Sequence, residues 1–339
     1  MNILLISPLQ DQQTGVYIHS ALIELGHRVA YFDWRLVTKN SGVEQMNKEL
    51  IEGFRELKPD LAIVVKGLGI LPETIKEIRK FHKEPIVGMI FDARLGEQLV
   101  KDVQPYIAFI KELDKFYTTD AEGIDGLKAL GIDTKLLLEG CYIPMNKEIV
   151  INSVQKQKYG ADVVFIGSID PIHKERMTFL KRIHDEGFYL KIYGEVHGKP
   201  PSWIDEHHTG FAAINDYHSI VSQSSKIVLG TDEYRDRKYG FSARLYRVLC
   251  AGGFYLTSKA KGIEDFFIPG KHIDVYDNAD ELVEKISLYL SNDELREKIA
   301  KAGQKEVLEK HTYEMRMQEL IDDVKPKLLN TGTTNYIIK

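Results

Sequence analysis

The run KIVLG at residues 226–230 is followed by a helical pattern at 242–251 and then by the run FYLTS at 254–258. Short β-branched and apolar runs separated by helices indicate a parallel sheet that helices cover on both faces. The same alternation extends along the chain in both directions. The other predicted strands are residues 3–6, 28–32, 61–65, 86–91, 115–118, 134–138, 163–167, 190–194 and 273–276. Long helical patterns cover 43–57, 72–81, 173–186 and, with breaks near Asn292 and His311, 279–329.

The alternation lapses once, in the polar segment MNKEIVINSVQKQKYG at 145–160. A chain of 339 residues is long for one domain and comfortable for two. We therefore expect two doubly wound, Rossmann-like α/β domains, an N-terminal one at 1–145 and a C-terminal one at 161–319, joined by a linker at 146–160. The tail at about 320–339 is expected to pack back on the N-terminal domain.

The composition excludes several classes of protein. Hydrophobic residues make up 43% of the chain and charged residues 28%, which argues against general disorder. The net charge of −5 provides no global basic field, so no nucleic-acid partner is expected. Cys141 and Cys250 are too few and too far apart for a disulfide framework or a cysteine zinc site. Because the start MNILLISP lacks signal-peptide features and no apolar run is long enough to span a bilayer, a cytoplasmic location is expected.

The loops that follow the strands are the places to look for chemistry. In open parallel sheets, ligands bind beyond the carboxyl ends of the strands. Two such domains facing each other would form a central cleft that these loops line.

Two segments of the second half, 241–258 (FSARLYRVLCAGGFYLTS) and 262–316, resemble group 1 glycosyltransferases, and most closely the branch that includes the spore-maturation protein CgeB. The shared features are an arginine, a small helix with an Ala-Cys-Gly-type turn, a Gly-Leu-Glu-like loop, a Pro-Gly turn and the closing His-Thr-Tyr signature at 311–313. The likeness is strong over 161–316 and modest before it. It implies a GT-B fold whose N-terminal domain binds the acceptor and whose C-terminal domain binds a nucleotide sugar.

A diphosphate leaving group needs its growing negative charge stabilised, and GT-B enzymes generally use cationic side chains and main-chain amides for this purpose. Arg244, in the first turn of its helix, is the leading candidate, since a guanidinium binds phosphate in a bidentate way. The other donor-side candidates are Gly167 and Ser168, Tyr193 and Gly194, and Gly262, Ile263 and Glu264, each set following a predicted strand. Each also has an ordinary structural interpretation, as a surface arginine, a turn, a core tyrosine or an acid that stabilises a helix start.

The chain departs from the family pattern at one motif. Many group 1 enzymes carry two glutamates eight positions apart, the second usually contacting the ribose, and Tyr239 and Arg247 stand at these positions here. Arg247 follows Arg244 by about one helical turn, so both can share a face. They form a two-arginine clamp for phosphate or carboxylate, or else Arg247 pairs with an acid such as Glu233.

Acceptor-side candidates follow the strands of the first half. Asp92, which ends the fourth strand, is the leading candidate for acceptor activation, and a helix N-cap is its structural alternative. His19 is the second catalytic candidate because its ordinary pKa lies near neutral pH, although a surface or core histidine is the commoner role. The remaining acceptor-side candidates are Thr14, Gly15, Lys66 and Asp120.

His207 and His208, with His197 and Asp205, suggest a metal cluster at first sight. Adjacent histidines usually diverge, and no second pair completes four ligands, so we expect no metal and no cofactor. The expected reaction is a metal-independent transfer of sugar from a nucleotide sugar to a hydroxyl of a glycan, a lipid or a small molecule. A lipid acceptor would bring peripheral membrane contact.

Two other functions fit the same sequence. A GT-B protein that binds a nucleotide or glycan without turnover is favoured by the missing glutamates. Another nucleotide-sugar enzyme, such as an epimerase, would share the fold and the donor.

Overall fold

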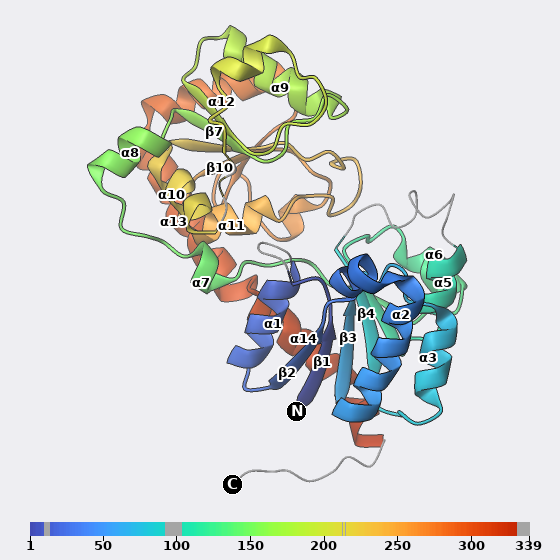
Figure 1. Ribbon diagram of the computed structural model, residues 1–339. Helices are drawn as coiled ribbons and strands as arrows, with labels where there is room; N and C mark the ends of the chain where they lie inside the picture. Colours follow the sequence, from blue (N-terminus) through green and yellow to red (C-terminus); the bar gives the residue numbers. More distant parts are fainter. Residues whose placement is uncertain (10–13, 92–103, 212, 214, 331–339) are drawn as a thin grey trace. The chain divides into compact units, whose positions relative to one another are not determined.

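The computed structural model describes residues 1–9, 14–91, 104–211, 213 and 215–330 (Figure 1). The chain divides into two compact units. The N-terminal unit comprises Met1–Leu138 together with Tyr313–Lys339, and the C-terminal unit comprises Glu139–Thr312. Each unit has its own parallel sheet.

The N-terminal unit is built on a six-stranded parallel sheet with the strand order β2-β1-β3-β4-β5-β6. Its strands are β1 (Asn2–Ile6), β2 (Arg28–Phe32), β3 (Leu61–Val65), β4 (Ile86–Ile90), β5 (Lys115–Thr118) and β6 (Thr134–Leu136). The described helices of this unit are α1 (Thr14–Glu24), α2 (Trp34–Leu57), α3 (Pro72–Arg79), α5 (Gln104–Ile110), α6 (Ile124–Ala129) and α14 (Tyr313–Asn330).

The C-terminal unit has a five-stranded parallel sheet with the order β11-β10-β9-β7-β8. Its strands are β7 (Val163–Ile166), β8 (Leu190–Tyr193), β9 (Ile227–Gly230), β10 (Tyr255–Ser258) and β11 (Asp274–Tyr276). Its described α-helices are α7 (Ile143–Asn146), α8 (Ser153–Tyr159), α9 (Lys174–Asp185), α10 (Asp216–Ser224), α11 (Arg244–Cys250), α12 (Ala279–Ser291) and α13 (Asp293–Lys310). Two short 3-10 helices, η1 (Ser202–Glu206) and η2 (Ile263–Asp265), lie in its loops.

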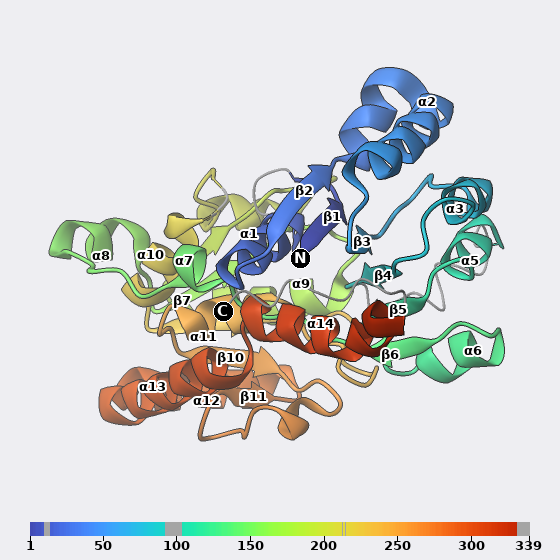
Figure 2. The same ribbon diagram turned by 90° about the horizontal axis from the view of Figure 1, so that it is seen from below.

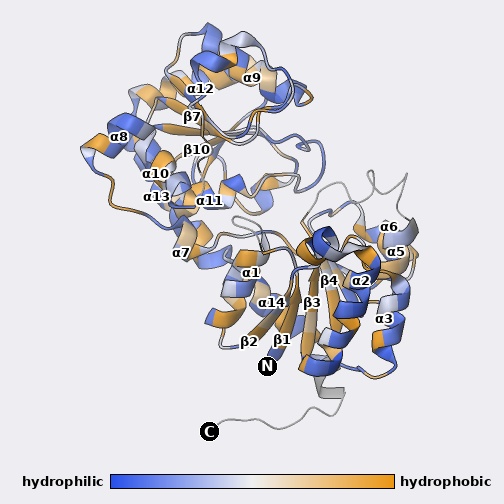
Figure 3. Cartoon of the chain, viewed as in Figure 1, coloured by the Kyte–Doolittle hydropathy of each residue, from blue (hydrophilic) through white to orange (hydrophobic). Residues whose placement is uncertain are grey.

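The central strands form the cores of both units. β3 and β4 are buried along their whole length, as are β7 and β9. Continuous apolar runs are needed here because helices cover both faces of a parallel sheet. Figure 3 shows this distribution, with apolar strands inside and helices that carry a polar outer face.

Each sheet has a topological switch point beside its first strand. β1 pairs with β2 on one side and with β3 on the other, and β7 likewise lies between β8 and β9. The connections to the two neighbours leave toward opposite faces of the sheet, so a crevice opens beyond the carboxyl ends of the central pair. The fold therefore places ligand sites after β1 and β3 in one unit and after β7 and β9 in the other.

Every strand predicted from the sequence is present, and the pattern at 279–329 is divided into α12, α13 and α14 at the predicted breaks. α2 begins earlier than predicted, at Trp34, because the Asp33 side chain accepts a hydrogen bond from the Leu36 N–H at 2.9 Å and caps the helix. Gly42, with φ of 83°, interrupts the helical geometry, which explains why the sequence pattern becomes regular only after it.

The polar segment at 146–160 contains a helix, α8. Asn152 and Gln155 form a capping box in which each side chain accepts a hydrogen bond from the other's main-chain N–H, at 2.9 and 3.1 Å. No residue of α8 is buried. The polar residues that led to the prediction of a linker therefore include those of a surface helix.

The last helix, α14, belongs to the N-terminal unit although it follows the C-terminal unit in sequence. It packs beside α1 (Figure 2), where the Tyr17 and Tyr313 ring centroids lie 5.5 Å apart. Farther along, the Asp323 carboxylate accepts a hydrogen bond from the Tyr117 hydroxyl at 2.7 Å and pairs with the Lys115 ammonium at 2.9 Å. These contacts hold α14 against β5.

The chain therefore passes between the units twice, after Leu138 and after Thr312. Within the C-terminal unit these two segments lie side by side. The Cys141 N–H donates to the His311 carbonyl at 3.0 Å, and a β-bridge pairs Cys141 with Thr312. A Cβ on Gly140 would lie 2.8 Å from the His311 carbonyl oxygen, so only glycine permits this approach.

Replacing Asp323 tests the anchoring of α14. Asp323→Ala removes the acceptor of the Tyr117 hydroxyl and the partner of Lys115, and we expect it to lower the free energy of unfolding by about 1–3 kcal/mol. Asp322→Ala is the matched control, because Asp322 is exposed and bonds only along its own helix to Lys325 and Gln318 among the described contacts. Thermal melting of both variants should show a large fall for Asp323→Ala alone; equal falls would contradict this account.

Candidate functional site

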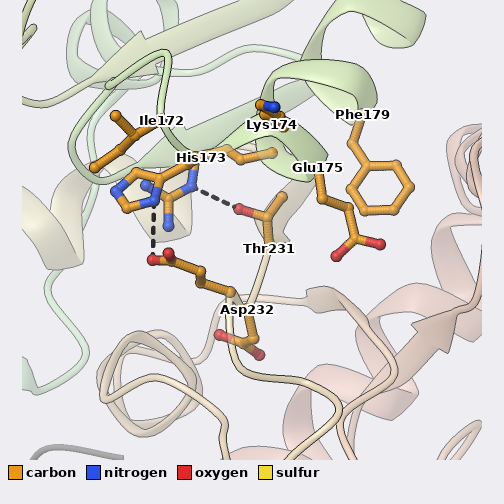
Figure 4. Close-up of a pocket in the computed structure, with 9 residues that line it drawn as sticks. Ile172, His173, Lys174, Glu175, Phe179, Thr231 and Asp232 are labelled. Atoms are coloured by element: carbon orange, nitrogen blue, oxygen red, sulfur yellow. Dashed lines mark hydrogen bonds and ion pairs between the residues drawn. The ribbon is translucent and has the colours of Figure 1, made fainter. Parts of the chain in front are cut away.

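A small pocket of about 70 Å³ lies beyond the carboxyl ends of β7 and β9 (Figure 4). We call it the β7–β9 pocket, and its lining residues are 172–176, 179 and 231–233. It occupies the switch point of the C-terminal sheet. His173 and Glu233 close one side through a contact of 2.9 Å between the imidazole Nδ1 and the carboxylate.

Arg176, in the first turn of α9, is one of two guanidinium groups at this switch point. Its Nη1 donates to the Ser168 carbonyl at 2.9 Å and its Nε donates to the Thr231 hydroxyl at 3.0 Å, so it joins the loops after β7 and β9. Burial, and next the charge of Arg244, lower the pKa of Arg176 to about 10. The group stays charged at neutral pH at an electrostatic cost.

Arg244, at the start of α11, is the second guanidinium. Its Nε donates to the Ile166 carbonyl at the end of β7, and its centre lies 4.7 Å from the Phe165 ring. Arg176 lies over the same ring at 5.4 Å. Arg244 Nη1 is buried, and among the described residues no acceptor meets it with good hydrogen-bond geometry; the Tyr255 hydroxyl is a neighbour. Two cations thus share one aromatic ring, and a donor group remains to be satisfied.

Asp232 is a buried acidic group that acts electrostatically on both arginines. It is buried, which raises its pKa, while Arg244 and hydrogen bonds act in the opposite direction. Its carboxylate accepts from the Ser242 N–H at 3.1 Å and from the Thr257 hydroxyl at 3.2 Å. These bonds fix the loop that leads into α11, and they hold Arg244 in place at the start of that helix.

Two glycines allow the strand ends to approach the arginines and each other. A Cβ on Gly167 would lie 2.5 Å from Arg244 Nη2, and a Cβ on Gly194 would lie 2.0 Å from the Gly167 carbonyl oxygen. The Gly167 N–H donates to the Tyr193 carbonyl at 2.8 Å. Gly167, Ser168, Gly194 and Arg244, four of the predicted donor-side residues, therefore lie around one point.

The structure contradicts the prediction that Tyr193 is a donor-side residue. Its side chain is buried in the core, and its hydroxyl donates to the Tyr159 carbonyl at 2.6 Å. The ring therefore has no exposed face on which a nucleotide base could stack.

The loop at Gly262, Ile263 and Glu264 forms the start of η2, as the sequence predicted. Its main-chain N–H groups are partly used internally: the Ile263 N–H donates to Ala260, and the Ile263 side chain is fully buried. Glu264 faces Lys259, with 3.7 Å between the charged groups. Only part of this loop is therefore available to a ligand.

Tyr239 and Arg247 stand at the two positions where the resemblance to group 1 glycosyltransferases implies glutamates. Tyr239 has φ of 64° and its ring packs on Gly262, where a Cβ would come within 2.7 Å, while its hydroxyl donates to Asp265 at 2.8 Å. Arg247 acts on His218 electrostatically. Glu233, the acid suggested as a partner for Arg247, contacts His173.

A second pocket, of about 230 Å³, lies at the switch point of the N-terminal sheet. We call it the β1–β3 pocket. It brings together three predicted acceptor-side residues, Thr14, Gly15 and Lys66, with two that the sequence did not single out, Ser7 and Arg35. Lys66 adopts a left-handed φ of 63°, and its carbonyl accepts a hydrogen bond from the Tyr106 hydroxyl at 2.7 Å. A strained backbone at a strand end is common at binding sites.

The remaining acceptor-side predictions lie elsewhere. Asp92 falls outside the described residues. His19 does not line the β1–β3 pocket; its ring lies edge-on to Tyr31, with centroids 6.0 Å apart, and partial burial lowers its pKa. Asp120 is buried, and its carboxylate accepts a hydrogen bond from the Gly123 N–H at 3.2 Å, which fits a turn-stabilising role.

The histidines considered for metal binding are dispersed. His208 Nε2 lies 2.8 Å from the Gly194 carbonyl oxygen, and His197 lies 3.6 Å from Glu195. His207 instead meets His184, with 2.9 Å between their ring nitrogens, and Glu206 is close to both.

This chain resembles known proteins in sequence over part of its length and in fold over nearly all of it. Residues 175–322, which include most of the β7–β9 pocket, match a family model described as glycosyl transferase-like. No curated protein sequence matches the chain.

Solved structures match the whole chain. Sucrose-phosphate synthase from Thermosynechococcus elongatus superposes with a TM-score of 0.72 at 12% identity, covering 97% of this chain and 99% of that one. The fold is GT-B. The Anabaena protein HepE in complex with UDP and glucose gives 0.65 at 11% identity, with 96% and 100% covered. A glycosyltransferase from Rickettsia africae gives 0.66 at 12% identity, with 97% and 99% covered. Among the described residues, no helix is both long and apolar enough to cross a membrane.

Arg176 is the most informative residue that sequence reasoning missed. It stands in HKERMTF, where charged residues look like the solvent face of a helix. The available signal was its place in the first turn of the helix after β7, the same kind of position that singled out Arg244. Asp232 was also missed, although it stands two residues after the end of β9.

The dependence of stability on pH tests the environment of His218, a buried histidine near Arg247 and Arg244. Burial, followed by the charges of Arg247 and Arg244, lowers the pKa of His218 to about 3. In the unfolded chain the group takes up its proton near pH 6.5, so the unfolded state binds more protons between these values and stability falls as the pH is lowered through this range.

We expect His218→Gln to flatten the decline in unfolding free energy between pH 6.5 and pH 4.5 by up to about 1.4 kcal/mol per pH unit. Urea unfolding at several pH values measures this slope. His197→Gln, which removes an exposed histidine, controls for histidine number. Parallel slopes in wild type and His218→Gln would refute the assignment.

Proposed function

We propose that this protein is a glycosyltransferase that moves a sugar from a nucleotide-sugar donor to an acceptor hydroxyl. The glycosyl transferase-like match and the GT-B fold support the reaction class. HepE, which shares the fold, was solved with UDP and with UDP-glucose, and this supports a nucleotide sugar as the donor class. We assign the donor diphosphate to the switch point of the C-terminal sheet, where Arg176 lines the β7–β9 pocket and Arg244 shares the Phe165 ring with it. We assign the acceptor to the β1–β3 pocket.

The observation that carries the proposal is the pair of guanidinium groups, those of Arg176 and Arg244, at the carboxyl ends of β7 and β9 beside the Phe165 ring. Two guanidinium groups over the Phe165 ring repel each other, and this repulsion adds to burial, the larger cause, in lowering the pKa of Arg176. A diphosphate between them would remove this repulsion and accept hydrogen bonds from both. The switch point supplies the crevice, and Gly167 and Gly194 keep it clear of side chains.

The same arrangement suits the chemistry of transfer. The bond between the anomeric carbon and the diphosphate oxygen breaks, the acceptor oxygen forms the new bond, and the acceptor proton passes to a base. Negative charge grows on the departing diphosphate, and fixed cations stabilise it where it develops. Arg176 and Arg244 would supply this stabilisation without a metal. Asp92 remains our candidate base for an inverting reaction, and a leaving-phosphate oxygen would serve in a retaining one.

The acceptor assignment rests on the β1–β3 pocket. Lys66 and Arg35 give it positive charge, and Thr14 offers a hydroxyl group, whereas the Ser7 hydroxyl is buried and donates to the Pro8 carbonyl at 3.1 Å. Hydroxyl groups of this kind hydrogen-bond sugar hydroxyls. The two cations favour an acceptor with a phosphate or carboxylate, whether it is a glycan, a lipid or a small metabolite.

The missing glutamate pair supports one competing function, binding of a nucleotide sugar without turnover. Arg247 has no hydrogen-bond acceptor, and the Tyr239 hydroxyl is a neutral, single acceptor that already donates to Asp265. Neither replaces a carboxylate that accepts from both ribose hydroxyls. Incubation with donor and varied acceptors distinguishes the alternatives: a glycosylated product indicates transfer, a changed sugar with donor alone indicates an epimerase, and binding without either indicates a non-catalytic protein.

A ligand screen tests the donor class. We expect at least one of the UDP-, GDP-, ADP-, CMP- and TDP-sugars to raise the melting temperature, because a ligand that binds only the folded state stabilises it by mass action. At a concentration of about 100 times Kd, the gain is about 2.7 kcal/mol. Unchanged melting temperatures with every donor would count against the proposal.

Substitution of the arginines tests the site. Arg176→Ala and Arg244→Ala should each weaken binding of the identified nucleoside diphosphate by about 10- to 150-fold, since a hydrogen bond to a charged group contributes about 1.5–3 kcal/mol. Calorimetry measures the affinity. Stability should change much less than affinity, because removing one of two like charges relieves repulsion.

Arg182→Ala is the matched control on the same helix. Arg182 is paired with Glu186 at 3.0 Å and with Asp280 at 3.2 Å and does not line the β7–β9 pocket, so its removal should leave the affinity unchanged. Wild-type affinity in Arg244→Ala would exclude this donor site.

A further inference from the structure

A second polar cluster lies on the edge of the C-terminal sheet, at the opposite end of β8 from the β7–β9 pocket. His184 stands near the end of α9, and Glu206 and His207 stand at the end of η1. The His207 carbonyl accepts a hydrogen bond from the N–H of Ile192, in β8, at 2.9 Å. The cluster therefore joins a helix, a short turn and the edge strand.

The three side chains present their donor atoms to one point. His184 Nδ1 and His207 Nε2 are 2.9 Å apart, and these atoms and a Glu206 carboxylate oxygen all lie within 4.8 Å of one another. Two imidazole nitrogens and a carboxylate oxygen are a donor set that Zn²⁺ commonly takes. The carboxylate also offsets part of the positive charge of an ion.

The spacing of the nitrogens fits an ion with a small adjustment. Two Zn–N bonds of about 2.05 Å at a tetrahedral angle hold their nitrogens about 3.35 Å apart. The two rings would have to separate by about 0.4 Å, an amount within the range of a side-chain rotation. Glu206 is exposed and can move to meet the ion.

The surroundings hold the two rings in orientation. The Trp203 ring stacks on His184 at 5.4 Å and 27°, and it also lies 6.4 Å from His207.

A plain hydrogen bond between two neutral imidazoles also gives a separation of 2.9 Å. In that state one ring donates its N–H and the other accepts, and Glu206 takes no part. The two states differ in what they predict for Glu206: an ion needs its carboxylate, and a histidine–histidine hydrogen bond does not.

We propose that His184, Glu206 and His207 bind one Zn²⁺ ion, with water as a fourth ligand, and that the ion ties the end of α9 to the edge of the sheet. The proposal is independent of sugar transfer. It has a consequence for the other end of β8, because His208, next to His207, contacts the Gly194 carbonyl at 2.8 Å. Ordering His207 would thereby steady the turn that packs on Gly167.

Metal titration of the full chain tests this site. Metal-free protein is titrated with Zn²⁺ in competition with a chromophoric chelator, and separately with Co²⁺, whose visible absorption reports the ligand geometry. We expect one tight equivalent per chain, loss of that equivalent in His184→Ala and His207→Ala, and an affinity at least about 10-fold weaker in Glu206→Gln. Zn²⁺ should also raise the melting temperature of the wild type and leave that of His207→Ala unchanged.

His197→Ala is the control for adventitious binding, because it removes another histidine of this unit, one that lies near Glu195 and outside the cluster. It should bind Zn²⁺ as the wild type does. Since Glu206 is exposed, Glu206→Gln is expected to fold even where a histidine variant does not. Wild-type affinity in Glu206→Gln, or no stoichiometric binding by the wild type, overturns the proposal.

Discussion

The placement of two guanidinium groups over one phenylalanine ring is the constraint on which the C-terminal unit depends. Like charges repel, and burial strengthens the repulsion because water no longer screens it. Arg176 and Arg244 stay together because backbone carbonyls at the ends of β7 and its loop, together with the Phe165 ring, hold each of them. The unit accepts a local electrostatic cost to keep cations at a strand end, and such a cost is typical of positions selected for binding.

The two switch points explain why pockets occur where they do. In both sheets the first strand lies between neighbours whose connections leave toward opposite faces, so the strand ends there are not covered by a crossover. The residues after these strands are small or conformationally unusual: Gly167 and Gly194 in one unit, and Lys66 with its left-handed φ in the other. Topology provides the crevice, and a few residues give it its chemistry.

Local sequence was enough to predict the sheets, because strands buried on both faces need unbroken apolar runs such as LAIVV and VVFI. A family pattern also marked Arg244, whose role in donor binding stays a prediction. The position and burial of individual side chains were harder to predict. Tyr193 ends a strand in the right place, yet its ring turns into the core. The sequence around Arg176 is typical of a surface helix. Only the fold brings the first turn of that helix to the loops after β7 and β9.

The short elements were missed for a similar reason. α10 is largely buried and rich in serine, so it lacks the polar face that makes a helix visible in sequence. The pairing of His184 with His207 joins residues 23 apart through tertiary structure alone. Clusters of this kind have no sequence spacing by which they could be recognised.

The return of α14 to the N-terminal unit has a consequence for biosynthesis. The ribosome makes the strands of that unit first, yet the helix that supports β5 emerges only after the entire C-terminal unit has been translated. Domains generally fold as units during synthesis, N-terminal first. Here that order is reversed: the half that is translated first stays incomplete until α14 has been made, and a chain terminated before α14 would lack the helix that packs against β5.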